Sequence, residues 1–105
     1  MIRAVILIPV TDNSGDPFPG QHWQRLEERL LEVTGGCTRH HDVSGAWRNP
    51  AGIIYGDVSG QYVVYLESFR QLATWITVVD WSREHFHQEA IATEVNGYSE
   101  IFGRQ

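Results

Sequence analysis

Two segments of this chain, residues 2–10 and 62–66, are apolar along almost their whole length. A strand that is buried on one face alternates apolar and polar residues, so a continuous apolar run indicates a strand that is covered on both faces. A layer of helices can cover only one face of a sheet. In a chain of 105 residues, we expect a second copy of the chain to cover the other face. The alternative is that the long first loop with Phe18, or a C-terminal hairpin, folds across this face within one chain.

Two segments have helical spacing. The first covers about residues 21–34 and ends before Gly35-Gly36, because glycine readily adopts the left-handed conformation that closes a helix. The second begins at Ser68, which forms a capping box with Gln71. The apolar stripe of the first helix is Trp23, Leu26, Leu30 and Val33. The apolar stripe of the second is Phe69, Leu72, Ile76, Val79 and Phe86.

Extended runs lie before, between and after these helices. They are residues 3–10, 37–47, 53–55 with 61–67, 89–95 and 98–102. Residues 56–60 are either a bulge in one long strand or a separate hairpin turn, and the sequence leaves both readings open. Asn96-Gly97 is typical of a two-residue hairpin turn with positive φ at both positions.

The order of these elements is strand, helix, strand, strand, helix, strand. It predicts an α+β fold, a ferredoxin-like β-α-β-β-α-β sandwich. Two helices would cover one face of an antiparallel sheet, and a C-terminal hairpin would extend it. We expect residues 1–105 to form a single domain.

Composition restricts the partners. The formal net charge is −5, and the eight basic residues are arginines scattered along the chain, which argues against a nucleic-acid partner. The first apolar run is too short to cross a bilayer, so we expect no membrane partner and a cytoplasmic location. Cys37 is the only cysteine, so no disulfide within the chain and no all-cysteine zinc site can form.

Several short motifs occur in a fixed order along the chain. They are Asp12-Asn13-x-Gly15-x-Pro17-Phe18, Gly35-Gly36-x-Thr38, Gly45-x-Trp47-Arg48, Gly52-x-x-Tyr55-x-Asp57 and Phe86-x-Gln88-Glu89-Ala90-Ile91. In these the chain resembles a family of small, uncharacterised bacterial proteins with a ferredoxin-like fold. The resemblance implies no catalytic residues. At the level of fold the chain is also similar to dimeric ferredoxin-like barrels, which include small oxygenases, isomerases and stress proteins.

Histidines give one set of candidate catalytic residues. His40 and Asp42 would point to the same side of a strand, where the carboxylate can orient the imidazole as a general base. His85 and His87 lie at the end of the second predicted helix. If these histidines converged with His41 they could form an imidazole metal site. The alternative is polar decoration of a strand and a helix end, and we predict no metal and no cofactor.

A second set of candidates surrounds the turn between the middle strands. Aromatic side chains supply burial and charged groups supply orientation, which is how small-molecule pockets are built. The alternative is cross-strand aromatic packing with an aspartate in a turn. The candidate ligand-binding residues are Trp47, Arg48, Tyr55, Asp57 and Tyr62.

Val78 and Trp81 share a second stripe on the second helix, on a face away from the predicted apolar stripe. An aromatic residue exposed on such a face marks an interface or covers a neighbouring loop. We therefore predict that Val78 and Trp81 form an interface with a partner.

No nucleophile elbow, phosphate-binding loop or dinucleotide fingerprint occurs in the sequence. The main prediction is therefore a non-catalytic interaction or regulatory module that acts as a homodimer on an unknown protein or small-molecule partner. Two alternatives stay open. One is a small-molecule-binding protein, and the other is a small cofactor-free or metal-dependent enzyme of the dimeric ferredoxin-like barrel type.

Overall fold

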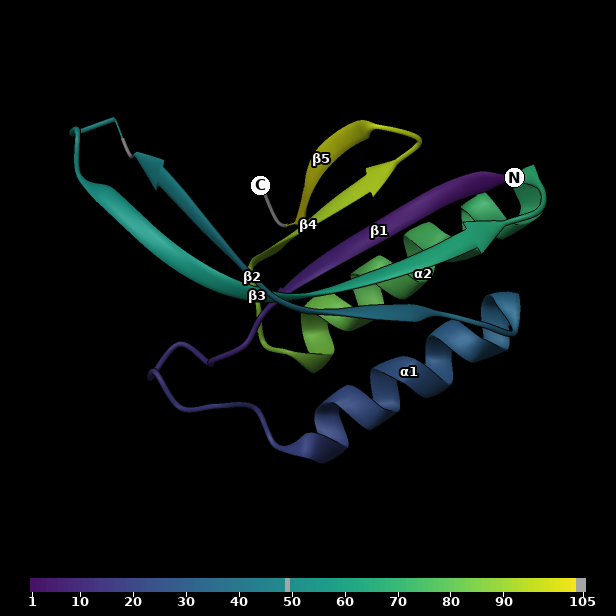
Figure 1. Ribbon diagram of the computed structural model, residues 1–105, viewed down its shortest axis with the longest axis horizontal. Helices are drawn as coiled ribbons and strands as arrows, with labels where there is room; N and C mark the ends of the chain where they lie inside the picture. The colour runs from purple at the N-terminus through teal and green to yellow at the C-terminus, as the bar shows by residue number, and fades with distance from the viewer. Residues whose placement is uncertain (49, 104–105) are drawn as a thin grey trace.

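The computed structural model describes residues 1–48 and 50–103, and only the backbone of residues 41 and 47 (Figure 1). The elements are β1 (Ile2–Pro9), α1 (Gly20–Thr34), β2 (Thr38–Arg48), β3 (Ile54–Leu66), α2 (Phe69–His85), β4 (Ala90–Val95) and β5 (Tyr98–Gly103). None of the described helices is long and apolar enough to cross a membrane.

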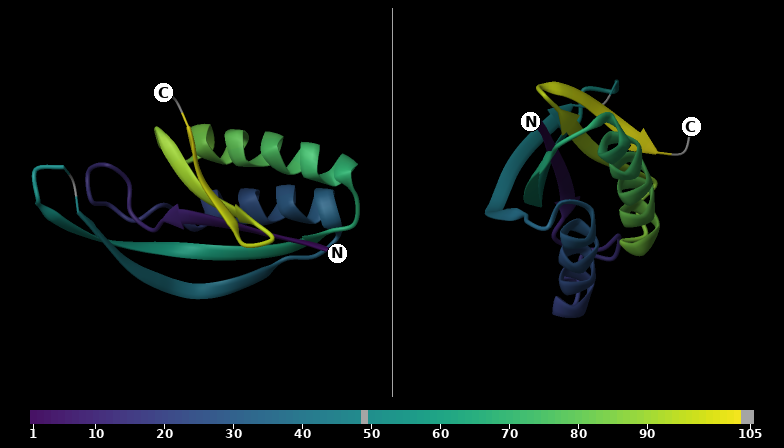
Figure 2. Two further views of the ribbon diagram at one scale, coloured as in Figure 1. Left: turned by 90° about the horizontal axis from the view of Figure 1, so that it is seen from above. Right: turned by 90° about the vertical axis from the view of Figure 1, so that its right-hand side faces the viewer.

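The five strands form one sheet in the order β2-β3-β1-β4-β5, and every neighbouring pair is antiparallel. Both helices lie on the same face of this sheet (Figure 2). The predicted mixed α+β architecture is therefore confirmed, with an antiparallel sheet, two helices on one face and a C-terminal hairpin formed by β4 and β5.

The core lies between the sheet and the helices. Alternate residues of β1 point toward the helices, because successive side chains of a strand point to opposite faces. Trp75 of α2 joins this core to the sheet: its Nε1 donates to Oγ1 of Thr93 at 3.1 Å, and that hydroxyl donates to the carbonyl of Val5 at 2.8 Å. The largest fully buried core residues include Ile6, Ile8, Leu26, Leu30, Tyr62, Leu66, Trp75, Phe86 and Ile91.

Local signals place the ends of several elements correctly. Gly35 ends α1 with φ 76°, and its N–H donates to the carbonyl of Leu31 at 2.8 Å. Asn96 and Gly97 have φ 49° and 86°, which confirms the predicted β4–β5 turn. Ser68 caps α2, but Oε1 of Gln71 accepts from the N–H of Glu67 rather than from that of Ser68.

The predicted faces of α2 are confirmed only in part: Val79 and Phe86 of the expected core stripe are buried, at 1% and 0% exposed, but other positions differ. Val78, expected on an outward face, is only 4% exposed, whereas Ile76 and Phe69 of the expected core stripe are 51% and 84% exposed. The buried line instead includes Ser82, which is fully buried because its hydroxyl donates to the carbonyl of Val78 at 2.8 Å. A prediction from the hydrophobic pattern does not place a serine in the core. Apolar residues also occur on several sides of α2, so the pattern does not define which side of the helix faces the sheet.

β3 is one continuous strand, so residues 56–60 form no separate turn. The irregularity lies in β2, where the register with β3 shifts between His40 and Val43. Together β2 and β3 form a long hairpin that extends past the end of β1 (Figure 1).

Two valines explain the apolar runs of β1 and β3. Val5 pairs with Val63, and both point away from the core residues Ile6 and Val64 that follow them. They are nevertheless only 2% and 4% exposed within this single chain. Neighbouring side chains of the same chain therefore bury them, and their burial does not require a second copy.

Candidate functional site

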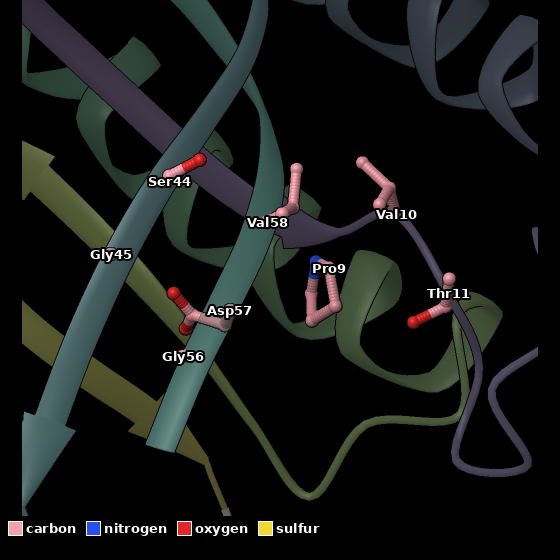
Figure 3. Close-up of a pocket in the computed structure, with 8 residues that line it drawn as sticks. All are labelled: Pro9, Val10, Thr11, Ser44, Gly45, Gly56, Asp57 and Val58. Carbon is pink, nitrogen blue, oxygen red and sulfur yellow. The ribbon is translucent and has the colours of Figure 1, made fainter. Parts of the chain in front are cut away.

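An open pocket of about 520 Å³ lies where β1 ends and the β2–β3 hairpin continues (Figure 3). The end of β1 and the loop after it form one wall, and the two strands of the hairpin form the other. The lining residues are Pro9, Val10, Thr11, Ser44, Gly45, Gly56, Asp57 and Val58.

Backbone hydrogen bonds fix the first wall. The N–H of Val10 donates to the carbonyl of Val58 at 3.0 Å, which is the last contact of this segment with β3. The chain then turns away, and an isolated antiparallel bridge between Thr11 and Pro17 closes the following loop. Phe18 returns to donate its N–H to the carbonyl of Val10 at 3.3 Å. The wall is thus anchored at both ends.

The loop itself is organised by Asp12. Its Oδ1 accepts from the N–H groups of Ser14 and Asp16, both at 2.9 Å. An aspartate that accepts from the backbone two residues later is a common turn former. Nδ2 of Asn13 also donates to the carbonyl of His87 at 3.4 Å, which connects the loop to the segment after α2.

The pocket combines an apolar patch with a few polar groups. Pro9, Val10 and Val58 supply the apolar patch, and Thr11 and Ser44 supply hydroxyl groups. Among the lining residues Asp57 alone carries a titratable side chain. This composition can hold a mainly apolar small molecule. Thr11, Ser44 and Asp57 can orient that molecule by binding its hydroxyl or cationic groups.

Gly45 is matched to the Asp57 carboxylate. The two residues are direct partners across β2 and β3, so their side chains share a face of the hairpin. A Cβ atom at residue 45 would lie 2.8 Å from Oδ1 of Asp57, which is too close for a real contact. The Asp57 side chain points toward β2 at this point (Figure 3), so glycine at 45 makes room for the carboxylate.

Among the predicted ligand-binding residues whose side chains the structure describes, Asp57 alone lines this pocket. Arg48 and Tyr55 are exposed on the outer part of the hairpin, and the side chain of Trp47 lies outside the described residues. Arg48 and Tyr55 thus share the hairpin with Asp57 but do not line the pocket.

Tyr62 is a core residue, which corrects its prediction as a pocket wall. It is fully buried, and its hydroxyl donates to Oε1 of Glu27 at 3.1 Å. Burial, helped by the negative charge of Glu27, raises the pKa of Tyr62 well above its ordinary value. The guanidinium of Arg39 lies over the Tyr62 ring, 5.8 Å from its centre. The apolar ring of Tyr62 packs in the core, and its hydroxyl is satisfied there by the hydrogen bond to Glu27 of α1.

The predicted catalytic histidines occupy separate places. His40 is exposed on β2, and the register shift after it breaks the alternation that was expected to bring Asp42 to the same side. His87 is exposed after α2, with φ 52°. Within the described part of the chain, no group of three or more histidine, cysteine, aspartate or glutamate side chains is arranged to hold a metal ion.

His85 instead belongs to a stack of rings between the helices. Its ring lies 4.6 Å from those of both His22 and Trp81, and its Nε2 donates to the carbonyl of His22 at 3.1 Å. Burial lowers the pKa of His85 below its ordinary value. Arg29 of α1 lies over Trp81, 4.8 Å from the ring centre. Trp81 is therefore half-buried and partly covered within the chain, which corrects the expected outward interface.

Sequence reasoning missed most of the pocket wall. The missed residues are Pro9, Val10, Thr11, Ser44, Gly45, Gly56 and Val58. The available signal was the pair of glycines, Gly45 and Gly56, because a glycine inside a strand often marks a close approach of another group. The sequence reading of residues 56–60 as a possible turn hid that signal.

Among the comparisons with known proteins, the one with solved structures supports the fold. The chain matches no protein-family model and no curated protein sequence. It is similar to the solved structure of a phage SAM lyase in complex with S-methyl-5'-thioadenosine, with a TM-score of 0.69 and 13% identity over 99% of this chain and 88% of that chain. The same phage SAM lyase in its apo state matches with a TM-score of 0.64, the same identity and the same coverage.

This similarity corrects the main functional prediction. We expected a non-catalytic interaction or regulatory module. The solved structures that share the fold along almost the whole chain are those of a lyase, which is an enzyme. The prediction of a non-catalytic module is therefore wrong, and the alternative that included a small enzyme fits the finding better.

Proposed function

We propose that this chain is a small enzyme that binds S-adenosylmethionine, or a related adenosine thioether, in the pocket at the end of β1, and cleaves it. The observation that carries the proposal is the match along 99% of the chain to a phage SAM lyase, with S-methyl-5'-thioadenosine bound in one of the two structures. At 13% identity that match concerns the fold, so the site is argued from this chain's own residues.

The pocket suits such a ligand in size and chemistry. A volume of about 520 Å³ lies within the usual range for small-molecule sites. Pro9, Val10 and Val58 would contact the purine and the methylthio group. The Asp57 carboxylate can accept hydrogen bonds from the ribose hydroxyls or from an ammonium group.

The proposed reaction breaks the bond between the sulfonium sulfur and the amino-acid chain of S-adenosylmethionine. The electron pair of that bond stays on sulfur, which becomes the neutral thioether of S-methyl-5'-thioadenosine. The four-carbon remainder balances the reaction by losing a proton or by closing on its own carboxylate. A positive charge disappears from sulfur, so apolar surroundings such as Val10 and Val58 favour the step relative to water.

Binding tests the proposal without requiring turnover. We expect S-methyl-5'-thioadenosine to bind the wild-type chain in a calorimetric titration. Asp57→Asn keeps the size of the side chain but removes its charge, and we expect it to weaken binding about 10- to 100-fold, since a lost charged hydrogen bond is worth about 1.5–3 kcal/mol. Glu32→Gln, on the exposed side of α1, is the matched control. Failure of the wild-type chain to bind would refute the proposal.

Four earlier expectations remain proposals. The strand order β2-β3-β1-β4 supports a single ferredoxin-like domain. Exposed apolar residues of the sheet, Ile54 at 63% and Ile101 at 69%, support a homodimer. Native mass spectrometry would count the subunits. Membership of the family of small bacterial proteins, and a cytoplasmic location, rest on the sequence patterns alone.

A further inference from the structure

One edge of β3 is open to the pocket. The register of β1 with β3 ends at the pair Pro9 and Ser59, and the N–H of Val10 then makes one more bond to the carbonyl of Val58. Residues 54–57 pair with β2 on one side. On the other side, no described strand pairs with Gly56. An unpaired edge of this kind presents unused hydrogen-bonding groups.

The direction of these groups follows from the pairing. In an antiparallel strand, the N–H and C=O of one residue point to the same side, and neighbouring residues point to opposite sides. The carbonyl of Val58 points toward Val10. Gly56 lies two residues earlier on the same strand, so its N–H and C=O point to that side as well. Gly56 has no side chain to cover them, and it lines the pocket.

A donor and an acceptor lie next to each other at this edge, in the plane of the sheet. The surface around them is apolar, since Pro9 and Val10 lie beside the edge (Figure 3). A flat heterocycle that carries a ring nitrogen next to an amino group complements such a pair. Adenine has this arrangement, an acceptor nitrogen beside the N6 amino donor.

We propose that the main chain of Gly56 recognises the adenine of the ligand. Its N–H donates to a ring nitrogen, and its C=O accepts from the N6 amino group. This inference rests on the proposed function, and it adds the element that selects the base. A site that hydrogen-bonds a polar group of its ligand discriminates strongly against analogues that lack the group, because the buried partners are then left unpaired.

Two substitutions separate the N–H from the rest of the residue. A Cβ atom at residue 56 would meet only the carbonyl oxygen of Gly45, at 3.8 Å, which is an ordinary contact, so Gly56→Ala fits and keeps the N–H. Gly56→Pro removes the N–H. Proline is tolerated in an edge strand where the N–H does not belong to the ladder, and the extended conformation of Tyr55 before it is compatible with proline.

The test is a calorimetric titration of the full chain with S-methyl-5'-thioadenosine. We expect Gly56→Pro to bind at least about tenfold more weakly than the wild type, and Gly56→Ala, which keeps the N–H, to bind more tightly than Gly56→Pro. Glu32→Gln, on the exposed side of α1, is the control and should bind as the wild type does. We also expect the N6,N6-dimethyl analogue, which has no N6 donor, to bind the wild type about tenfold more weakly than the parent compound. Thermal unfolding followed by circular dichroism checks that each variant is folded.

The outcomes are distinguishable. If the wild type does not bind S-methyl-5'-thioadenosine, both the proposed function and this inference are refuted. If the wild type binds and a folded Gly56→Pro variant binds equally well, only the inference fails. If Gly56→Pro does not fold, the N6,N6-dimethyl analogue decides: equal affinity for the wild type overturns the inference. A change of subunit number in Gly56→Pro would also contradict it, because the edge would then pair with a second copy.

Discussion

The carboxylate of Asp57 occupies the space that a side chain at Gly45 would need: a Cβ atom there would lie 2.8 Å from Oδ1 of Asp57. The two residues face each other across the β2–β3 hairpin. The absence of a side chain at Gly45 of β2 thus leaves room for the carboxylate of Asp57 on β3 in its observed position.

Gly45→Ala should therefore displace the Asp57 carboxylate without removing its charge. The conflict involves the end of a flexible side chain, so we expect the free energy of unfolding to change by less than about 1 kcal/mol. We expect affinity for S-methyl-5'-thioadenosine to fall severalfold in calorimetry. Glu32→Gln, on the exposed side of α1, is the control and should keep the wild-type affinity. Unchanged affinity of Gly45→Ala would show that the ligand does not depend on the position of Asp57.

The observed orientation of α2 predicts opposite effects for two apolar residues. Val78→Ala should lower the free energy of unfolding by about 2 kcal/mol, because Val78 is buried and its truncation leaves a cavity. Ile76→Ala should change it by less than about 0.5 kcal/mol, because Ile76 is half exposed. Urea denaturation measures both. The reverse order would mean that α2 presents the face expected from its hydrophobic pattern.

Tyr62→Phe should separate a core role from a ligand-binding role. The ring stays, while the hydrogen bond from the hydroxyl to Glu27 is lost. We expect the free energy of unfolding to fall by about 1–2 kcal/mol, because the bond is to a charged, half-buried group. Affinity for S-methyl-5'-thioadenosine should not change, and a clear loss of affinity in the folded variant would restore Tyr62 to the site.

His85 gives the protein a pH-dependent stability. Burial lowers its pKa in the folded state, so the unfolded state binds the proton first as the pH falls. The positive charges of His22, Arg25 and His87 also lower the pKa of His85, whereas the hydrogen bond to the carbonyl of His22 acts in the opposite direction. The contribution is therefore fully present above the ordinary histidine pKa and is lost as the pH falls from that value through the lower pKa of the folded state.

Urea denaturation at pH 7.5 and 5.5 checks this. The wild type should be less stable at the lower pH, and His85→Gln should lose part of that difference. His40→Gln, which changes an exposed histidine of β2, should keep the wild-type difference. Equal pH dependence in the wild type and His85→Gln would contradict the role assigned to burial.

Local chemistry made some features predictable from the sequence. Gly35, Asn96-Gly97 and Ser68 each act within a few residues of themselves, so the helix end, the hairpin turn and the cap followed from their neighbours. The α+β architecture followed in the same way, because it depends on the order of strongly patterned segments.

Features that depend on segments far apart in the sequence could not be predicted from local patterns. The pocket exists because β1 stops at Pro9 while β3 continues, and no local pattern states how far two strands pair. Asp57 was selected for its chemistry, but the glycine that accommodates it was not. Trp81 was read as exposed because Arg29, which lies over it, belongs to another helix.

The most direct test of the central claim is to incubate the purified chain with S-adenosylmethionine and follow the products by mass spectrometry. The account predicts that S-methyl-5'-thioadenosine accumulates above the rate of spontaneous breakdown, and that Asp57→Asn slows its release while Glu32→Gln does not. Release at the spontaneous rate by the folded wild type, or equal rates in wild type and Asp57→Asn, would contradict a cleavage site in the pocket at the end of β1.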